Sequence, residues 1–169
     1  MSSRNPARLF AALGAVLLFF TAPVSALEPG DALPDWALFE LEGEVPDLEG
    51  KVVMVDVWAS WCAPCKASFP AYAELQKEWA EQGFVILGVS VDRKSRDYER
   101  FLKQTPPGFP TVRDVSQKLA AELSPPAMPT SFIFGRDGKL RSVHKGYRGN
   151  STVSLLRSEI EPLLQESRP

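Results

Sequence analysis

The pattern of apolar and polar positions along the chain predicts several strands. Val52–Trp58 and Val85–Val91 are nearly continuous apolar runs, which is typical of strands buried on both faces of a sheet. Ser131–Phe134 and Leu140–His144 flank a Gly-Arg-Asp-Gly turn, which indicates an antiparallel hairpin. Trp36–Leu41 alternates and precedes a Glu-Gly pair, so we expect a short strand there as well.

Four further stretches carry apolar residues at spacings of three and four, which predicts helices with one buried face. Their apolar residues are Phe69, Tyr72, Leu75 and Trp79; Tyr98, Phe101 and Leu102; Val115, Leu119 and Leu123; and Val153, Leu156, Ile160 and Leu164. We expect Pro70 to kink the first helix and Pro162 to bend or fray the last. Strands alternating with helices and ending in a hairpin predict an α/β fold, a central mixed β-sheet flanked by helices.

Residues 1–26 do not fit this pattern. Two arginines precede an uninterrupted apolar run over Leu9–Phe20, and Val24-Ser25-Ala26 has the small residues that signal peptidase recognises. The run is short for a membrane-spanning helix, which needs about 20 apolar residues. We therefore predict a signal peptide cleaved after Ala26, with an uncleaved N-terminal anchor as the alternative. Residues 27–169 then form one domain, as expected for a chain of 169 residues.

Charge gives only weak guidance about partners. The formal net charge is −2, and nucleic-acid binding usually shows as a basic patch, so we expect no nucleic-acid partner. Eight acidic residues lie between Glu28 and Glu49 without a Lys or Arg among them. Such a run is usually a solvated rim, and a docking surface for a basic partner is the alternative.

Cys62 and Cys65 are the only cysteines, in the order Trp61-Cys62-Ala63-Pro64-Cys65. A purely structural disulfide is a weak interpretation, because closing so short a loop stabilises a fold by only about 2 kcal/mol. Structural zinc needs four ligands, and the chain offers two thiolates and one histidine, His144, which we expect at the surface of the hairpin. A copper site with two cysteines and one histidine stays open.

Redox catalysis fits the position of the pair, between a buried strand and the start of a helix. The free N–H groups at a helix N-terminus would stabilise the thiolate of Cys62, and the thiolate is the reactive species. Pro64 suits the first helical turn, where a missing N–H donor has no cost. Cys65, one turn along, is placed to attack a mixed disulfide formed at Cys62. The pair is then a redox-active disulfide that needs no metal and no other cofactor.

Asp56 is the one charged residue within the strand that leads to the cysteines. An ionised carboxylate buried without a partner costs several kcal/mol, so burial should raise its pKa toward neutrality. A carboxyl group with such a pKa can act as an acid or base near neutral pH. The alternative is a strand position that is partly exposed or hydrogen-bonded.

The segment VDVWASWCAPCK resembles the active-site segment of thioredoxins, in which an aromatic residue precedes Cys-x-Pro-Cys-Lys at the end of a buried strand. Asp56 matches the buried acid that exchanges protons with the second cysteine in that family, and Pro70 matches its helix-kinking proline. Met128-Pro129-Thr130 resembles the cis-proline loop that lies against the cysteines. The resemblance implies a thioredoxin fold in which Cys62, Cys65 and Asp56 are catalytic. It also implies a substrate groove lined by Trp61, Ala63, Pro64, Met128, Pro129 and Thr130.

Three features are similar to the TlpA/ResA-like group of extracytoplasmic thiol-disulfide proteins: the export signal, the leading segment through Lys51, and an insertion over Asp92–Phe109. This similarity implies a TlpA-type N-terminal extension and a central helical insertion. Two positions depart from the group. Ala63 stands where ResA-type proteins have Glu, and Asp56 stands where many members have Asn. We therefore expect proton handling of the thioredoxin type.

The same resemblance implies a periplasmic, monomeric reductase of protein disulfides that serves the maturation of apocytochromes c or copper proteins. Its electron donor would be a membrane thiol transporter of the DsbD/CcdA type. The Ala-Pro pair between the cysteines is similar to that of reducing members, whereas strong oxidants have Pro-His. Two alternatives stay open. One is a peroxiredoxin-like peroxidase, whose Pro-x-x-x-Thr-x-x-Cys context is absent, and the other is a copper carrier resembling Sco proteins, which have Cys-x-x-x-Cys.

Overall fold

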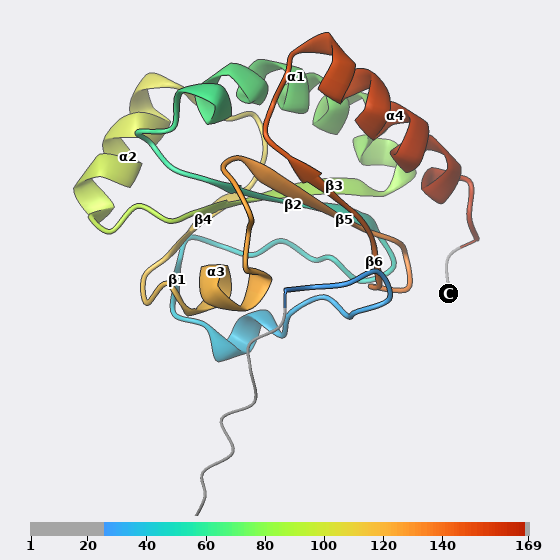
Figure 1. The fold of residues 1–169 in the computed structure, drawn as a ribbon, viewed down its shortest axis with the longest axis horizontal. Coiled ribbons are helices and arrows are strands. Elements are labelled where there is room, and N and C mark those ends of the chain that lie inside the picture. Colours follow the sequence, from blue (N-terminus) through green and yellow to red (C-terminus); the bar gives the residue numbers. More distant parts are fainter. Residues whose placement is uncertain (1–25, 168–169) are drawn as a thin grey trace, which may run out of the picture.

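A six-stranded sheet in the order β1-β4-β3-β2-β5-β6 is the centre of the computed structural model, which describes residues 26–167 (Figure 1). The strands are β1 (Leu41–Glu42), β2 (Val52–Trp58), β3 (Phe84–Ser90), β4 (Thr111–Asp114), β5 (Thr130–Phe134) and β6 (Leu140–Lys145). The helices are α1 (Ala63–Trp79), α2 (Ser95–Gln104), α3 (Lys118–Leu123) and α4 (Asn150–Leu164), with short 3-10 turns η1 (Trp36–Leu38) and η2 (Ala80–Gln82). Apart from Ala26, the predicted leader lies outside the described residues. Within residues 26–167, no helix is both long and apolar enough to cross a membrane.

The pairing of β2 with its neighbours makes the sheet mixed, as predicted. β2 runs parallel to β3 and antiparallel to β5, and β5 continues antiparallel to β6. One row of this pairing matters for the site, because Asp56 lies opposite Ser131, and Ser131 lies opposite His144. Side chains in one row of a sheet point to the same face.

Alternation along β2 divides the core into two layers. Val53, Val55 and Val57 belong to one layer, while Met54 and Trp58 belong to the other. The Val layer is covered by α3 and by the N-terminal extension, whose apolar side chains are partly buried against it. The Trp58 layer is covered by α1, α2 and α4, which lie on the opposite side of the sheet (Figure 1). Asp56 stands between Met54 and Trp58 and therefore faces the layer of α1.

The predicted insertion is helical, as expected, and packs firmly on the sheet. Phe101 of α2 lies 5.0 Å from Trp58 and 5.6 Å from Phe69, between ring centroids. Aromatic pairs at such distances add to the stabilisation that burial of their surface provides. The insertion is thus held beside the end of β2, where the cysteines follow.

One prediction about local structure is wrong, and one strand was not predicted. Trp36–Leu41 is not a strand: its first three residues form η1, capped by the Asp35 carboxylate, and only Leu41 joins β1. Trp36 and Phe39 instead pack against the face of the sheet. Because this segment is half-buried, its apolar and polar residues alternate as they would in an edge strand. Thr111–Asp114 was not predicted as a strand because two of its four residues are charged.

Both prolines lie inside helices that run through them. α1 continues past Pro70 to Trp79, and α4 continues past Pro162 to Leu164. The third predicted helix begins at Lys118 rather than near Val115, because the chain first completes β4.

Candidate active site

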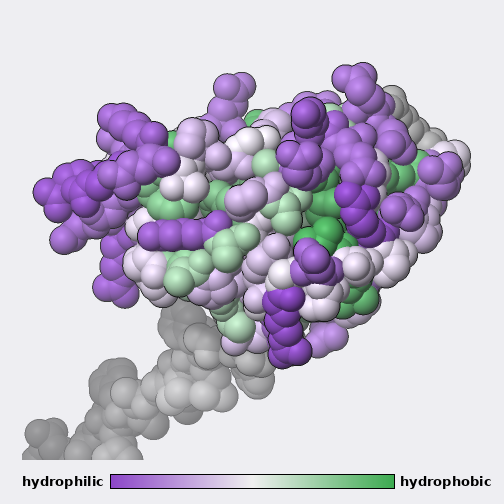
Figure 2. Space-filling view, turned by 90° about the horizontal axis from the view of Figure 1, so that it is seen from above, coloured by the Kyte–Doolittle hydropathy of each residue, from purple (hydrophilic) through white to green (hydrophobic). Residues whose placement is uncertain are grey.

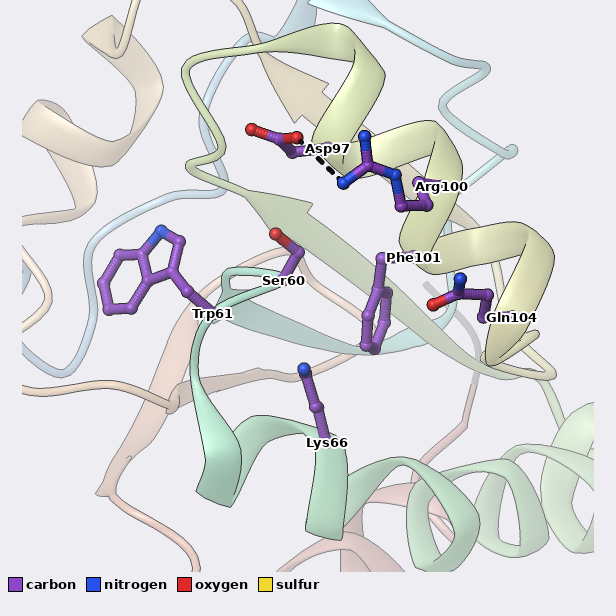
Figure 3. A pocket seen from close by; sticks show the side chains of 7 residues that line it. All are labelled: Ser60, Trp61, Lys66, Asp97, Arg100, Phe101 and Gln104. Atoms are coloured by element: carbon purple, nitrogen blue, oxygen red, sulfur yellow. Dashed lines mark ion pairs between the residues drawn. The ribbon is translucent and has the colours of Figure 1, made fainter.

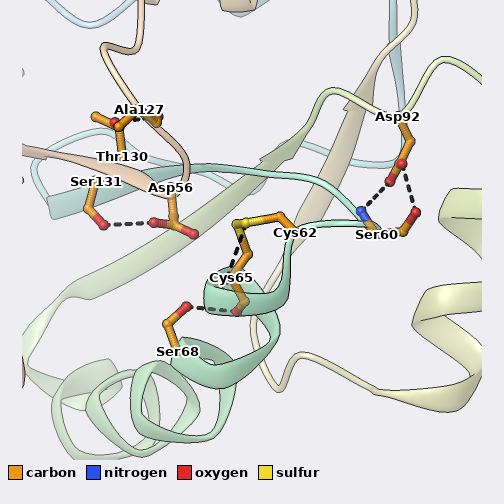
Figure 4. Close-up of a disulfide and its surroundings, with 9 residues drawn as sticks. All are labelled: Asp56, Ser60, Cys62, Cys65, Ser68, Asp92, Ala127, Thr130 and Ser131. Atoms are coloured by element: carbon orange, nitrogen blue, oxygen red, sulfur yellow. Dashed lines mark hydrogen bonds between the residues drawn. A yellow bond between two sulfur atoms is a disulfide. The ribbon is translucent and has the colours of Figure 1, made fainter. Parts of the chain in front are cut away.

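Cys62 and Cys65 lie where the chain passes from the end of β2 to the start of α1, and they are joined by a disulfide (Figure 4). Cys62 is the N-cap of α1, and its sulfur accepts a hydrogen bond from the backbone N–H of Cys65 at 3.3 Å. Exposure separates the two residues, because Cys62 is 5% exposed whereas Cys65 is 0% exposed. Cys62 is therefore the one residue of the pair that keeps some contact with solvent.

The helix start gives Cys62 the electrostatic setting that the sequence predicted. Pro64 occupies the first turn of α1, where its missing N–H is not needed. The Cys65 N–H and the positive end of the helix dipole would stabilise the sulfur of Cys62 as a thiolate after reduction.

The loop before Cys62 is fixed by a buried carboxylate at the start of the insertion. Asp92 accepts hydrogen bonds from the backbone N–H and the hydroxyl of Ser60, at 2.9 and 2.8 Å (Figure 4). It also accepts one from the Ser90 hydroxyl at 2.8 Å. Arg113 donates to the backbone carbonyl of Asp92, and its guanidinium pairs with Glu42 of the N-terminal extension. Extension and insertion therefore both support the loop that carries the cysteines.

Asp56 is fully buried in β2, on the face of the sheet that α1 covers. Its Oδ1 accepts a hydrogen bond from the Ser131 hydroxyl at 2.7 Å, while Oδ2 has no hydrogen-bond partner within residues 26–167. Burial raises the pKa of Asp56 to about 7, and the bond from Ser131 opposes this rise. In Figure 4 the carboxyl group points toward the disulfide. The prediction of a buried carboxyl with a raised pKa is confirmed, and the hydrogen bond weighed as an alternative is present too.

Ser131 also contacts a second buried hydroxyl. The Tyr72 hydroxyl of α1 lies 3.3 Å from the Ser131 hydroxyl, and burial raises the pKa of Tyr72. Since a hydroxyl both donates and accepts, Ser131 can donate to Asp56 and accept from Tyr72. Within residues 26–167, burial and the neutral Ser131 hydroxyl are therefore what shift the pKa of the Asp56 carboxyl group, and no cation contributes to the shift.

The predicted cis-proline loop is present, since the peptide bond between Met128 and Pro129 is cis. The Thr130 hydroxyl donates to the Ala127 carbonyl at 2.8 Å, which ties the loop to the start of β5 (Figure 4). Pro129 and Thr130 are buried, and Met128 is half-buried against the core layer that contains both cysteines.

The other predicted groove residues lie at the surface around Cys62. Ala63 and Pro64 are exposed, and Trp61 is 68% exposed, an unusual state for so large an apolar side chain. An exposed tryptophan beside an accessible sulfur can bind a polypeptide without disturbing the fold.

His144 is not the surface residue that the sequence predicted. Its side chain is only 9% exposed, and its Nε2 lies 2.9 Å from the carboxylate of Glu159 in α4. The Ser142 hydroxyl donates to the same carboxylate. Within residues 26–167, no group of three or more His, Cys, Asp or Glu side chains is arranged to hold a metal ion.

Sequence reasoning did not identify Ser131, Asp92 or Ser60 as parts of the site. Ser131 and Asp56 are separated by 75 positions, and Asp92 and Ser60 by 32, so no local spacing connects them. The only signal was that Ser131 closely follows the Met128-Pro129 pair at the start of a predicted strand. Its contact with Asp56 depends on the register between β2 and β5.

A central mixed sheet with a cysteine pair at the N-terminus of a helix and a cis-proline loop defines a class, the thioredoxin-like thiol-disulfide oxidoreductases. Comparison with known proteins agrees with this class. The AhpC/TSA family model matches residues 29–143, and the chain belongs to this thioredoxin-like family.

The relatives with curated names make the activity more specific. The thiol-disulfide oxidoreductases ResA of Geobacillus thermodenitrificans and Bacillus subtilis are 30% and 32% identical to this chain. The alignments cover 91% and 85% of this chain and 91% and 81% of the relatives. A solved structure from Chlorobium tepidum, assigned as a thiol:disulfide interchange protein DsbE, is 35% identical with a TM-score of 0.72. The match covers 82% of this chain and 99% of the Chlorobium tepidum chain. The chain is therefore a thiol-disulfide oxidoreductase.

Proposed function

We propose that this protein is a periplasmic reductase of protein disulfides that acts through a mixed disulfide at Cys62. The observation that carries the proposal is the asymmetry of the site. Cys62 keeps slight exposure at the helix N-terminus, whereas Cys65 is fully buried. The Asp56 carboxyl group points toward the disulfide, and its second oxygen has no hydrogen-bond partner within residues 26–167 (Figure 4). A nucleophile at the surface and a resolving thiol next to a base are what disulfide reduction requires.

The reaction begins with the reduced enzyme. The Cys62 thiolate attacks one sulfur of the substrate disulfide, so the substrate bond breaks and its other sulfur leaves as a thiolate that takes a proton from water. Trp61 and Met128 line the groove around the resulting mixed disulfide, and Pro129 and Thr130 order the loop on which the substrate backbone lies. Ala63 and Pro64 complete the exposed edge of the groove.

Resolution uses the buried residues. The Cys65 thiol gives its proton to Asp56, and the Cys65 sulfur attacks the sulfur of Cys62. The mixed disulfide breaks, the second substrate sulfur leaves as a thiolate that takes a proton from water, and the Cys62–Cys65 disulfide forms. Two electrons have then passed from the enzyme to the substrate, and a base with a pKa of about 7 can accept the proton at neutral pH.

Trapping of the mixed disulfide tests this sequence of steps. The Cys65→Ser variant should hold substrate proteins on Cys62 in a complex that dithiothreitol releases, and Cys62→Ser should trap nothing. A reduction potential close to that of a strong oxidant such as DsbA, about −120 mV, would contradict the reducing direction.

Location, donor and oligomeric state belong to the same proposal. The leader predicted over residues 1–26 supports export, and recharging by a membrane thiol transporter of the DsbD/CcdA type would follow from it. The substrates would be apocytochromes c or proteins of copper-site maturation, and the enzyme would act as a monomer. Cell fractionation with N-terminal sequencing tests the export, since cleavage after Ala26 leaves Leu27 as the first residue.

A peroxidase is the second candidate, because the matching family model is that of AhpC/TSA proteins. Ala59 and Val55 stand at the positions that the Pro-x-x-x-Thr-x-x-Cys context would give to Thr and Pro. Peroxide consumption no faster than that of a Cys62→Ser control would remove this candidate.

A further inference from the structure

The pocket nearest to the cysteines is lined by cations and lies between α1 and the insertion. It has a volume of about 320 Å³, and its lining includes Trp61, Lys66, Arg100 and Phe101 (Figure 3). Trp61 is the residue before Cys62, and Lys66 is the residue after Cys65. The pocket therefore lies next to the place where a mixed disulfide would form at Cys62.

The two cations of the pocket are presented on rigid supports. Lys66 follows the disulfide in α1, and its ammonium lies 5.4 Å from the centre of the Phe101 ring. Arg100 precedes Phe101 in α2, which is held by the contact of Phe101 with Trp58. In Figure 3 the side chains of Lys66 and Arg100 lie on opposite sides of Phe101.

Asp97 offsets part of this charge. Its carboxylate lies 3.6 Å from Arg100 and 3.9 Å from Arg96, and half or more of each arginine side chain is exposed. Exposed ion pairs at such distances are weak, so Arg100 stays available to a second anion. The pocket itself holds two cations against one carboxylate.

The surrounding surface has the same sign. Between residues 92 and 104 the chain has five cations, Arg93, Lys94, Arg96, Arg100 and Lys103, against three acids. One of these acids, Asp92, is buried and bound to Ser60. Seen from the side of α1, α2 and α4, hydrophilic residues crowd the end of the molecule formed by α2 (Figure 2).

The acidic run between Glu28 and Glu49 belongs to the extension, whose apolar side chains pack on the opposite face of the sheet. Apart from Glu42, which accepts a hydrogen bond from Ser95 of α2 and pairs with Arg113, charge is divided between two segments, with an excess of cations in the insertion and an excess of carboxylates in the extension. Such a division orients a charged partner during its approach.

We propose that this pocket, which we call the Lys66–Arg100 pocket, selects substrate proteins that carry an acidic segment next to the disulfide to be reduced. The inference rests on the proposed function, because it assigns a substrate class to the same cysteine pair. A carboxylate side chain that enters between Trp61 and α2 forms ion pairs with Lys66 and Arg100. Basic segments in the same place are repelled.

Three cyclic peptides test the selection. Each has the disulfide of a Cys-Gly-Gly-Cys segment, flanked on both sides by two Asp, two Ser or two Lys residues. Their rates of reduction by the stoichiometrically reduced enzyme are measured at low salt. We expect the Asp peptide to react about fivefold faster than the Ser peptide, as the stronger exposed ion pairs allow, and the Lys peptide to react slowest. Added salt should reduce these ratios.

Variants separate the pocket from net charge. Arg100→Gln should bring the ratio of Asp to Ser rates close to one, and Asp97→Asn should increase it. Lys77→Gln is the matched control, because it removes the same charge from an exposed position of α1 that lies 12 residues beyond Cys65, about 18 Å along the helix. It should leave the ratio unchanged.

Equal rates for the three peptides, or a ratio that Arg100→Gln leaves unchanged, would overturn the inference while the reductase activity stands. A ratio lowered equally by Lys77→Gln would also overturn it, since net charge alone would then explain the preference. If the enzyme reduces none of the peptides, the proposed function fails, and the selection fails with it.

Discussion

Ionisation of Asp56 should weaken the fold of the oxidised protein as the pH rises. The carboxyl group is fully buried, its Oδ2 has no partner within residues 26–167, and burial raises its pKa to about 7 from an ordinary value of 3.8. Asp56→Asn removes the ionisable group and keeps an oxygen that can accept the hydrogen bond from Ser131.

Proton linkage gives the direction and the size of this change in the free energy of unfolding. Below pH 3.8 the carboxyl group is protonated in both the folded and the unfolded chain. Between that pH and about 7 it is ionised only when unfolded, so the free energy of unfolding falls as the pH rises. Above about 7 the loss is complete. A difference of about three pKa units corresponds to about 4 kcal/mol, of which about 3 kcal/mol is lost between pH 5 and pH 8.

Urea unfolding at pH 5 and pH 8 measures this loss, with the disulfide intact so that neither cysteine titrates. The free energy of unfolding of the wild type should fall by about 3 kcal/mol more than that of Asp56→Asn between these two pH values. The absolute stability of the variant is not informative, because the new amide brings its own buried N–H groups. Asp47→Asn is the control, since the Glu49 backbone N–H and Lys51 lower the pKa of that exposed carboxyl group, which therefore titrates below this range.

Equal losses in the free energy of unfolding for wild type and Asp56→Asn between pH 5 and pH 8 would refute this prediction. Such a result would mean that the buried carboxyl group does not change its protonation state between pH 5 and pH 8, and its pKa would then not be suited to exchanging a proton with Cys65 near neutral pH. Infrared spectroscopy gives an independent check, because a protonated carboxyl band should be present at pH 5 in the wild type and absent in the variant.

Three further substitutions test other parts of the site. Ser131→Ala removes the hydrogen bond that lowers the pKa of the buried Asp56 carboxyl group. The pH profile of disulfide reduction should therefore move to higher pH by up to about one unit, and an unchanged profile would contradict this role. Trp61→Ala should change the free energy of unfolding by less than about 0.5 kcal/mol, because the side chain is exposed, while reduction of insulin slows about fivefold and reduction of a small aromatic disulfide does not. Glu42→Gln should lower the free energy of unfolding in urea by about 2 kcal/mol, because the buried Arg113 guanidinium loses its carboxylate partner. A loss no greater than that of Asp47→Asn would show that this ion pair is dispensable.

The chemistry of the cysteine pair was predictable because its determinants are local. A buried apolar run, a cysteine at its end, a second cysteine one helical turn later and a proline between them are all read from neighbouring positions. The same holds for the buried face of α1 and for the hairpin of β5 and β6. The segments toward the β1 edge of the sheet were harder to predict, because η1 has the alternation of a strand and β4 is short and charged.

The sequence by itself determined which sulfur begins a helix, which carboxyl group stands in a buried strand and which proline precedes β5. Only the tertiary structure decided that Ser131 donates to Asp56, that Asp92 holds Ser60, that His144 is paired with Glu159, and that Lys66 and Arg100 line one pocket. Hydrophobic periodicity and helix signals act within one element, whereas these contacts arise from strand order, from register and from the packing of an insertion onto the sheet. Those choices depend on the burial of the whole core rather than on the residues that meet there.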